Sequence, residues 1–427
     1  MKSDVREYRL PASFFMKNRE KLAACLPDRF VAVLFAGNAV CMSGDSDYPF
    51  FANRNFYYFA GIEQEESVLV LLQTQEMKMT SYLFIQIADE RKERWMGKRL
   101  TKDYASTYSG IDRVMDLPSL DDFLLPYISD ESLPIVLETN LSRGPGKAFE
   151  KRVLSLPKER EAISLMPIGT KLRMIKEPCE IEMIRTAIKL TGEAIREFIP
   201  LISPGVTELA LTSSFDYSLA KRGCLVPAFP TIIATGENAL CLHHMNPSGT
   251  ASAGDLIQID VGGRVGGLCA DISRVFPVNG QFSARQSALY QAVIMCQKAA
   301  VSYIRPGVTL AQINDVTRET ARQEIDRIGL FPDNESEEKD VSKYYWHSVS
   351  HHLGHDVHDV CEKDTPLSPG MVLTVEPGLY IPEWGMGFRI EDDVLVTVGG
   401  CEVLSDDLAR EAEDICAQMN HAKKWGD

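Results

Sequence analysis

The sequence predicts an α/β (α+β) protein of two domains, and its length, its composition and the order of its apolar segments support this prediction. The chain has 427 residues, which is more than one hydrophobic core usually serves. Apolar residues make up 45% and charged residues 25% of it, as is ordinary for globular proteins. Short β-rich runs fill the first third, and helical patterns precede further strands in the rest. We therefore expect a smaller domain over residues 1–170 and a larger one over residues 171–427.

Three apolar runs in the first third have the composition of β-strands. They are Val31–Phe35, Ser67–Leu72 and Ser81–Gln86, each rich in Val, Leu, Ile and aromatic residues. Turn-rich or charged segments that could hold helices separate the runs. This pattern predicts that the N-terminal domain is an α/β domain.

The domain boundary is expected just before a strongly amphipathic helix. From about residue 157 to residue 172 the pattern has no clear periodicity. A helical pattern follows, with Pro178 before it and Pro200 after it. The isoleucines that share one face of this helix are Ile181, Ile184, Ile188 and Ile195. Such a stripe predicts a helix that packs on a core.

A repeated four-residue motif indicates that the larger domain contains two related halves. A helical pattern leads into Pro-Gly-Val-Thr at residues 204–207, and another leads into the same four residues at 306–309. A second helical pattern follows each. The spacing is too long for a solenoid repeat, so we interpret it as one duplication. The alternative is that Pro-Gly-Val-Thr recurs by chance as a helix-ending turn.

Charge and cysteine usage exclude several functional classes. The chain has 60 acidic and 45 basic residues, and its net charge of -15 opposes broad contact with nucleic-acid phosphates or anionic lipid. The ten cysteines form no CxxC pair, which favours a reducing compartment. The N-terminus lacks a signal-peptide pattern, and no stretch approaches the roughly 18 apolar residues of a membrane span. We expect a cytoplasmic protein with no nucleic-acid or membrane partner.

Two aspartates are predicted to lie close together on a β-hairpin. Asp260 interrupts the apolar run of residues 254–263, and a glycine-rich turn then leads to a second strand near Asp271. Two carboxylates on adjacent strands repel each other unless one is protonated or cations lie between them. The alternative is that each is an ordinary turn or surface residue.

Five of the eight histidines lie within twelve residues. They are His347, His351, His352, His355 and His358. Histidine is a common ligand of divalent metals, so the cluster favours a metal site or a proton-transfer site. Each of these histidines could instead have a structural role. Their spacing alone does not decide which one binds a metal.

Two glutamates complete the predicted site. Glu376 ends one β-rich run, and Glu391 interrupts a second strand two residues after Arg389. A buried carboxylate needs a partner, and Arg389 or metal ions could supply it. The two glutamates, Asp260, Asp271 and one histidine form an oxygen-rich set that suits a divalent ion such as Mn²⁺.

These motifs together resemble those of a known family. The aspartate hairpin reads DVGGRVGGLCADISRVFPV, the histidine segment HSVSHHLGHDVHD, and the glutamate strands TVEPGLYI and GFRIEDDVLVT. In this order they resemble the pita-bread metallopeptidases and, within them, the aminopeptidase P family. The resemblance implies a pseudo-symmetric pita-bread catalytic domain after a small creatinase-like N-terminal domain.

The resemblance also implies an activity. The family removes the N-terminal residue from peptides with proline at the second position, by attack of a hydroxide that bridges two divalent metals. Mn²⁺ is the expected metal, with Zn²⁺ and Co²⁺ as alternatives. A pocket shaped to the proline ring could select this bond, because proline lacks an N–H and its ring fixes φ. Prolidase, which cuts Xaa-Pro dipeptides, is the nearest alternative; a metal-free creatinase-like hydrolase and a non-catalytic peptide-binding module are more distant ones.

Carried over to this sequence, the resemblance gives each residue of the site a role. Asp260 would bind one metal, His351 and Glu376 the other, and Asp271 and Glu391 would bridge the two. Glu376 would either act purely as a ligand or also transfer a proton.

The remaining implied roles concern substrate. His243 would face the substrate, His347 would line the pocket, and His358 would face the scissile carbonyl. Arg389 and Tyr380 would lie beside the ligands and orient them. The chain departs from the family at His244, where the family often has Tyr, and at Met245, Asn246, Leu268 and Ser273. His352 and His355 are additional, and we expect them beside the ligands or at the surface.

The N-terminal third takes part in the resemblance. The segments ANRNFYYFAGIEQEESVLVLL and ERWMGKRL resemble the domain that precedes the catalytic domain in aminopeptidase P and prolidase. Trp95 would be the aromatic residue that reaches toward a partner subunit's active site, or else an anchor within its own domain. A homodimer or homotetramer is expected.

Overall fold

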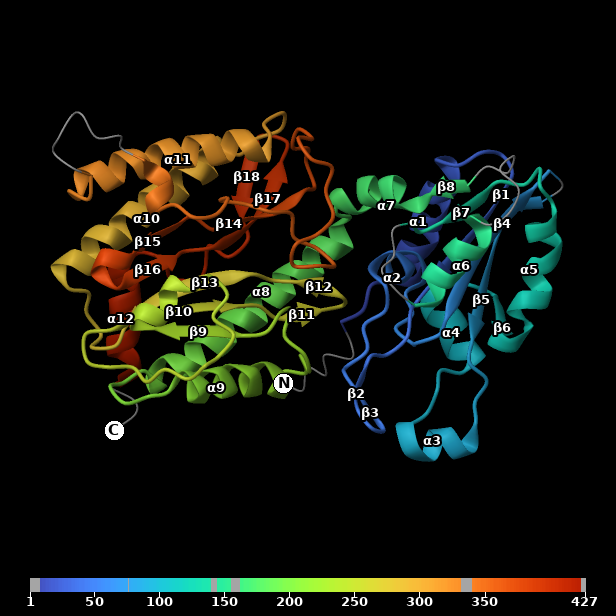
Figure 1. Cartoon of the computed structure of the whole chain (residues 1–427), viewed down its shortest axis with the longest axis horizontal. Coiled ribbons are helices and arrows are strands. Elements are labelled where there is room, and N and C mark those ends of the chain that lie inside the picture. The colour runs from blue at the N-terminus through green and yellow to red at the C-terminus, as the bar shows by residue number, and fades with distance from the viewer. Residues whose placement is uncertain (1–7, 76, 140–143, 155–161, 332–339, 424–427) are drawn as a thin grey trace. The chain divides into compact units, whose positions relative to one another are not determined.

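The computed structural model describes residues 8–75, 77–139, 144–154, 162–331 and 340–423 (Figure 1). Two compact units make up the chain: Leu10–Arg173 is one, and Met174–Asp427 with Tyr8 and Arg9 is the other. The predicted boundary between residues 170 and 171 stays a prediction. No helix among the described residues is both long and apolar enough to cross a membrane.

A six-stranded mixed sheet forms the centre of the N-terminal unit. Its strand order is β6-β5-β4-β1-β7-β8. Its strands are β1 (Phe30–Phe35), β4 (Val68–Thr74), β5 (Met77–Ile85), β6 (Arg113–Asp116), β7 (Ile135–Leu137) and β8 (Ala162–Ser164). The three strands predicted from sequence are β1, β4 and β5, which pair antiparallel in the middle of the sheet. Both faces of β1 and β4 are largely buried, which explains their continuous apolar runs.

Helices and one short hairpin complete this unit. The helices are α1 (Ala12–Ala24), α2 (Arg54–Ala60), α3 (Glu90–Met96), α4 (Lys102–Ser109), η2 (Leu117–Ser119), α5 (Leu120–Ser129), α6 (Pro145–Leu154) and α7 (Leu165–Met174); the hairpin pairs β2 (Cys41–Ser43) with β3 (Ser46–Asp47). Helix α7 and strand β8 lie in the stretch that showed no periodicity; residues 157–161 of that stretch are outside the described residues. Helix α3 has no buried residue, and Trp95 on it is 82% exposed. Trp95 is therefore not an anchor within its own domain.

The first half of the larger unit is a helix pair followed by an antiparallel sheet. Its elements are α8 (Pro178–Phe198), η3 (Ile199–Leu201), α9 (Glu208–Lys221), β9 (Ile232–Thr235), η4 (Gly236–Leu240), β10 (Leu256–Val261), β11 (Arg264–Val265), β12 (Leu268–Cys269) and β13 (Ile272–Pro277). The predicted amphipathic helix is α8, and three of its four isoleucines are buried. Pro178 is the first helical residue and does not precede the helix, because Glu177 caps it in a capping box with Glu180.

The second half repeats this arrangement. Its elements are α10 (Ala284–Tyr303), α11 (Leu310–Arg327), η5 (Val341–Lys343), β14 (Val372–Val375), β15 (Gly378–Ile381), η6 (Pro382–Trp384), β16 (Met386–Arg389), β17 (Asp392–Thr397), β18 (Gly400–Val403) and α12 (Ala412–Lys423). The sheet orders are β13-β10-β9 in the first half and β14-β17-β18 in the second. Each half is thus a helix pair and a three-stranded antiparallel sheet (Figure 1).

The two Pro-Gly-Val-Thr turns have the same geometry. Gly205 and Gly307 both have a φ of 92°, a left-handed value that favours glycine. Thr207 caps α9 and Thr309 caps α11, each with its side-chain oxygen. The turns occupy equivalent places in both halves. This favours the duplication over chance as the reason why the Pro-Gly-Val-Thr motif is repeated.

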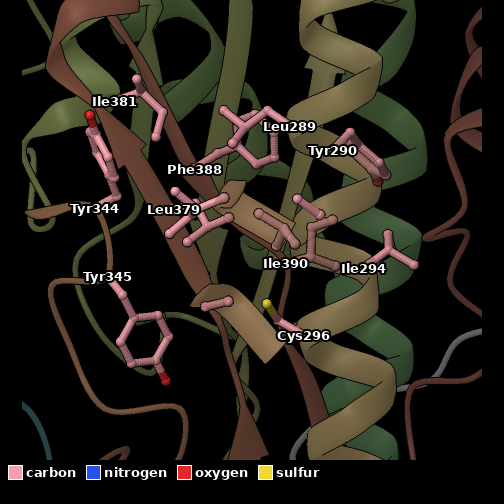
Figure 2. Close-up of a cluster of buried hydrophobic side chains, with 14 of the residues drawn as sticks. Leu289, Tyr290, Ile294, Cys296, Tyr344, Tyr345, Leu379, Ile381, Phe388 and Ile390 are labelled. Carbon is pink, nitrogen blue, oxygen red and sulfur yellow. The ribbon is translucent and has the colours of Figure 1, made fainter. Parts of the chain in front are cut away.

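A core cluster between α10 and the β15–β16 hairpin orients two residues of the predicted site. Leu379 and Ile381 of β15, and Phe388 of β16 with the adjoining Ile390, are buried in this cluster (Figure 2). Because side chains alternate along a strand, the intervening Tyr380 and Arg389 point to the opposite face. The apolar pattern of the hairpin therefore positions two polar groups.

Candidate metal centre

The histidine-rich segment is irregular in backbone but is held against β14. The backbone N–H of Leu353 donates to Val372, that of Thr374 donates to His351, and that of Glu376 donates to Val349, at 2.8–3.0 Å. These bonds place the segment alongside β14. His351 and Glu376 consequently come together, with 3.4 Å between Nε2 and Oε1.

Asp260 lies on a strand of the hairpin as predicted, whereas Asp271 lies just outside a strand. Strand β10 pairs antiparallel with β13, so that Asp260 lies opposite Ser273. Asp271 immediately precedes β13. Its Oδ2 lies 3.5 Å from Nε2 of His351, so the hairpin of the first half meets the histidine segment of the second.

Glu391 occupies a different local position from the predicted one. It lies in the link between β16 and β17, not inside a strand. Its backbone N–H donates to the carbonyl of Ser273 over 3.1 Å, and the hydroxyl of Ser273 donates to its Oε2 over 2.9 Å. These two bonds join the halves of the unit at the site.

Of the residues assigned to the site from sequence, all except Tyr380 line one pocket of about 330 Å³. They are His243, Asp260, Asp271, His347, His351, His358, Glu376, Arg389 and Glu391. Ligand atoms of Asp271, His351 and Glu391 all lie within 4.8 Å of one another, as a shared cation requires. Asp260 forms a buried ion pair with Arg389 through Oδ2.

Burial and crowding make this carboxylate cluster unfavourable without a cation. Burial, followed by the charges of Asp260, Asp393 and Glu376, raises the pKa of Asp271 well above its ordinary value. Burial and the neighbouring carboxylates raise the pKa of Glu391 in the same way. Burial is also the largest cause that raises the pKa of Glu376.

Oxygen atoms that lack partners point to what the cluster can hold. Oδ1 of Asp260, Oδ1 of Asp271 and Oε1 of Glu391 are buried and accept no hydrogen bond from the described residues. Unpaired buried carboxylate oxygens are costly. Divalent cations would compensate this cost, and one imidazole among hard oxygen ligands suits metals of the Mn²⁺ type. The residues present therefore fit a metal centre.

Two histidines at the pocket are held in the neutral form. Burial lowers the pKa of His347 to about 4. Its Nδ1 donates to the carbonyl of Ser348, so Nε2 is left to accept from the hydroxyl of Tyr380, 2.9 Å away. Burial likewise lowers the pKa of His358 to about 4, and its ring stacks on that of His351. Each therefore has one N–H at neutral pH.

Comparison with known proteins decides the family. Residues 182–398 match metallopeptidase family M24. The chain is 30% identical to Xaa-Pro aminopeptidase of Escherichia coli over 96% of this chain and 98% of the relative. It is 34% identical to Xaa-Pro aminopeptidase 3 of Rattus norvegicus, over 88% of this chain and 78% of the relative. The chain belongs to metallopeptidase family M24.

Solved structures extend the likeness to the whole chain. Residues 15–136 match the aminopeptidase P N-terminal domain. The structure of Escherichia coli aminopeptidase P with the inhibitor Pro-Leu superposes with a TM-score of 0.90 at 29% identity, covering 97% of this chain and all of the other. A Bacillus anthracis protein gives 0.92 at 36% identity, covering 97% and 99%. These matches confirm the predicted fold, an N-terminal domain followed by a pita-bread catalytic domain. They also confirm the prediction that the chain is a metal-dependent hydrolase.

Some site residues of this M24 chain were not found from sequence. Asp393 is buried below the pocket, and its Oδ2 accepts the backbone N–H of Asp271 over 3.1 Å. The run of three acidic residues from Glu391 to Asp393, with apolar residues before and after it, is the signal that marks it. His352 and His355 are 3% and 1% exposed, so neither is a surface residue.

The stability that bound metal ions add to the protein is expected to grow as pH rises from about 4 to 8. Asp271, Glu376 and Glu391 have raised pKa values in the folded state and ordinary ones, about 4, when unfolded. Through these three groups the folded metal-free state binds more protons above pH 4, so their contribution to its free energy of unfolding falls with rising pH, whereas the lowered pKa values of His347 and His358 act in the opposite direction below about pH 6.5. Thermal midpoints of chelator-treated and Mn²⁺-loaded protein at pH 5 and pH 8 measure this. A gap between the two forms that does not widen at pH 8 would contradict it.

Proposed function

We propose that this chain is an Xaa-Pro aminopeptidase, which removes the N-terminal residue from peptides with proline at the second position. The observation that carries the proposal is the cluster of four carboxylates and His351 around one pocket, in which Asp260, Asp271 and Glu391 are buried. Its relatives include Xaa-Pro aminopeptidases of bacteria and animals, and also intermediate cleaving peptidase 55 of Arabidopsis thaliana and Saccharomyces cerevisiae. None of the first relatives is named as a dipeptidase, which favours the aminopeptidase over prolidase.

We assign five residues to two divalent cations, with Mn²⁺ as the proposed metal. Asp260 would hold one ion, His351 and Glu376 the other, and Asp271 and Glu391 both. The unpartnered oxygens of Asp260, Asp271 and Glu391 support this assignment. Such a pair of ions supplies Lewis acidity and a nucleophile at neutral pH.

The protein's own side chains have distinct tasks in this proposal. Arg389 balances the charge of Asp260 and holds it in place through their ion pair. Neutral His358 has an N–H that can donate to the carbonyl oxygen as negative charge develops there. Neutral His347, oriented by Tyr380, and His243 border the space for the peptide. Burial raises the pKa of Glu376, which suits it to accept a proton from the attacking water and to pass it to the leaving proline nitrogen.

Cleavage of a tripeptide tests the function. Metal-stripped protein is assayed on Xaa-Pro-Yaa tripeptides and on Xaa-Pro dipeptides, with and without Mn²⁺. We expect Mn²⁺-dependent release of Xaa from the tripeptide. Cleavage confined to the dipeptide would make the chain a prolidase, and no cleavage with any divalent metal would overturn the peptidase assignment.

We also propose a homo-oligomer in a reducing compartment such as the cytoplasm. Trp95, Met96 and Ile87 are exposed around helix α3, and large exposed apolar groups of this kind often mark interfaces. All ten cysteines are free thiols, which suits a reducing environment. Light scattering of the wild type and of Trp95→Ala measures the assembly; a monomeric wild type would contradict it.

A further inference from the structure

A buried glutamate outside the pocket holds the loop that carries His243. Glu208 is the first residue of α9, directly after the capping Thr207, and its side chain is fully buried. It does not line the pocket. Buried carboxylates are rare unless they are fully hydrogen-bonded, so the partners of Glu208 indicate what it does.

Five donors surround the carboxylate. Oε1 accepts from the backbone N–H of Thr235 at 2.7 Å, from the hydroxyl of Thr235 at 3.0 Å and from the amide of Asn238 at 2.9 Å. Oε2 accepts from Nε2 of His244 at 2.9 Å and from the backbone N–H of Gly249 at 2.7 Å. Both oxygens are therefore satisfied, and every donor belongs to residues 235–249.

These contacts fix one loop at four points. Thr235 ends β9, Asn238 lies in η4, and His244 and Gly249 lie in the irregular chain that follows. Between Asn238 and His244 come Leu242 and His243, which both line the pocket. One carboxylate thus sets the path of the chain before, beside and after the pocket-lining pair.

The hydrogen bonds to Glu208 define which ring nitrogen of His244 carries a proton. Burial alone would raise the pKa of Glu208, but the hydrogen bonds from Asn238, Thr235, His244 and Gly249 hold it below its ordinary value. An ionised carboxylate only accepts hydrogen bonds, so Nε2 of His244 carries a proton. His244 is therefore a donor to Glu208, and it is the side chain adjacent to His243.

There is no spare room around this carboxylate. A Cβ on Gly249 would lie 2.5 Å from Oε1 of Glu208 and 2.6 Å from Nδ2 of Asn238. The close approach of the Gly249 backbone depends on the absence of a side chain. The loop can therefore be displaced either by removing the His244 bond or by filling this space.

We propose that Glu208 and His244 are positioning residues that fix residues 235–249 so that His243 faces the bound peptide. None of their donors and acceptors is an assigned metal ligand, and the ligands lie on other segments. The pair should therefore govern peptide affinity and leave the metals in place. This inference rests on the proposed peptidase function for its substrate.

His244→Phe and His244→Gln form the test pair. Phe keeps the ring volume but removes the donor to Glu208, whereas Gln restores a donor. We expect His244→Phe to raise KM for an Xaa-Pro-Yaa tripeptide about tenfold, the effect of losing one charge-assisted hydrogen bond, with kcat and metal content changed less than about twofold. His244→Gln should recover most of the loss. Gly249→Ala should raise KM in the same direction.

A second readout does not depend on turnover. Calorimetric affinity for a product dipeptide with N-terminal proline should weaken in His244→Phe in parallel with KM. Glu197→Gln is the control, since Glu197 is a partly exposed acid whose partners Ser218, Lys221 and Arg222 lie away from the loop. The proposal is overturned if KM and product affinity do not change, or if metal content falls with activity. A wild type that cleaves no tripeptide would instead overturn the proposed function.

Discussion

Replacing Asp271 with Asn is expected to reduce peptidase activity by about a hundredfold or more, while making the metal-free protein more stable. Residues that only orient metal ligands already cost 10- to 100-fold when removed, and Asp271 is assigned as a shared ligand. One of its carboxylate oxygens lies within 4.8 Å of the ligand atoms of His351 and Glu391. The amide is isosteric, so the loss follows from charge and not from shape.

The opposite effect on stability comes from the same charge. Without cations, Asp271 is buried among Asp260, Glu376 and Asp393, whose charges raise its pKa. The neutral amide removes this repulsion from the folded state. Thermal midpoints of the variant should therefore be higher than wild type after chelation and lower than wild type with saturating Mn²⁺.

Metal content and both midpoints are measured together, at pH 8 where the repulsion is largest. Asp406→Asn is a suitable control, because Asp406 is an exposed partner of Arg410 and such pairs contribute little. If Asp271→Asn kept its metals and its turnover, the shared-ligand assignment would be wrong. If the metal-free variant were instead less stable than metal-free wild type, Oδ1 of Asp271 would have to be hydrogen-bonded within the protein, and its assignment to a cation would lose its support.

The parts of the site that the sequence predicts are those with a local signature. Asp260 and Asp271 flank a glycine-rich turn, and a hairpin register places such residues together without knowledge of the rest of the chain. The histidine segment is conspicuous by its density, although its backbone has no periodicity. Strands β1, β4 and β5 were likewise visible because long buried strands give continuous apolar runs.

The parts that the sequence does not predict depend on contacts between distant segments. Glu391 lies outside a strand because it bonds to Ser273 of the other half. Asp393 becomes part of the site only because the backbone of Asp271 reaches it. In the sequence, Glu208 looks like an ordinary residue of the first helical turn. It is buried only because residues 235–249 pack against it and donate hydrogen bonds to its carboxylate. Helix α7 has a weak pattern that offers no clear stripe to read.

Replacing Glu376 with Gln is expected to lower kcat for an Xaa-Pro-Yaa tripeptide by about a hundredfold or more, with a much smaller change in KM. A positioned proton acceptor typically contributes 10² to 10⁴ in rate. Glu376 borders the pocket at 3.4 Å from Nε2 of His351 and 4.0 Å from Nδ1 of His347, and burial raises its pKa. Glutamine retains an oxygen that can act as a ligand but cannot accept the proton.

Metal content separates the two roles of Glu376. If the variant loses turnover while it keeps both ions, the residue transfers the proton, and the pH dependence of kcat should lose its acidic limb. If activity returns in proportion to added Mn²⁺, the residue acts purely as a ligand. Retention of both metals and full turnover would exclude the proton-transfer role, and His347, whose Nδ1 lies 4.0 Å from Oε2 of Glu376, would then be the next residue to replace.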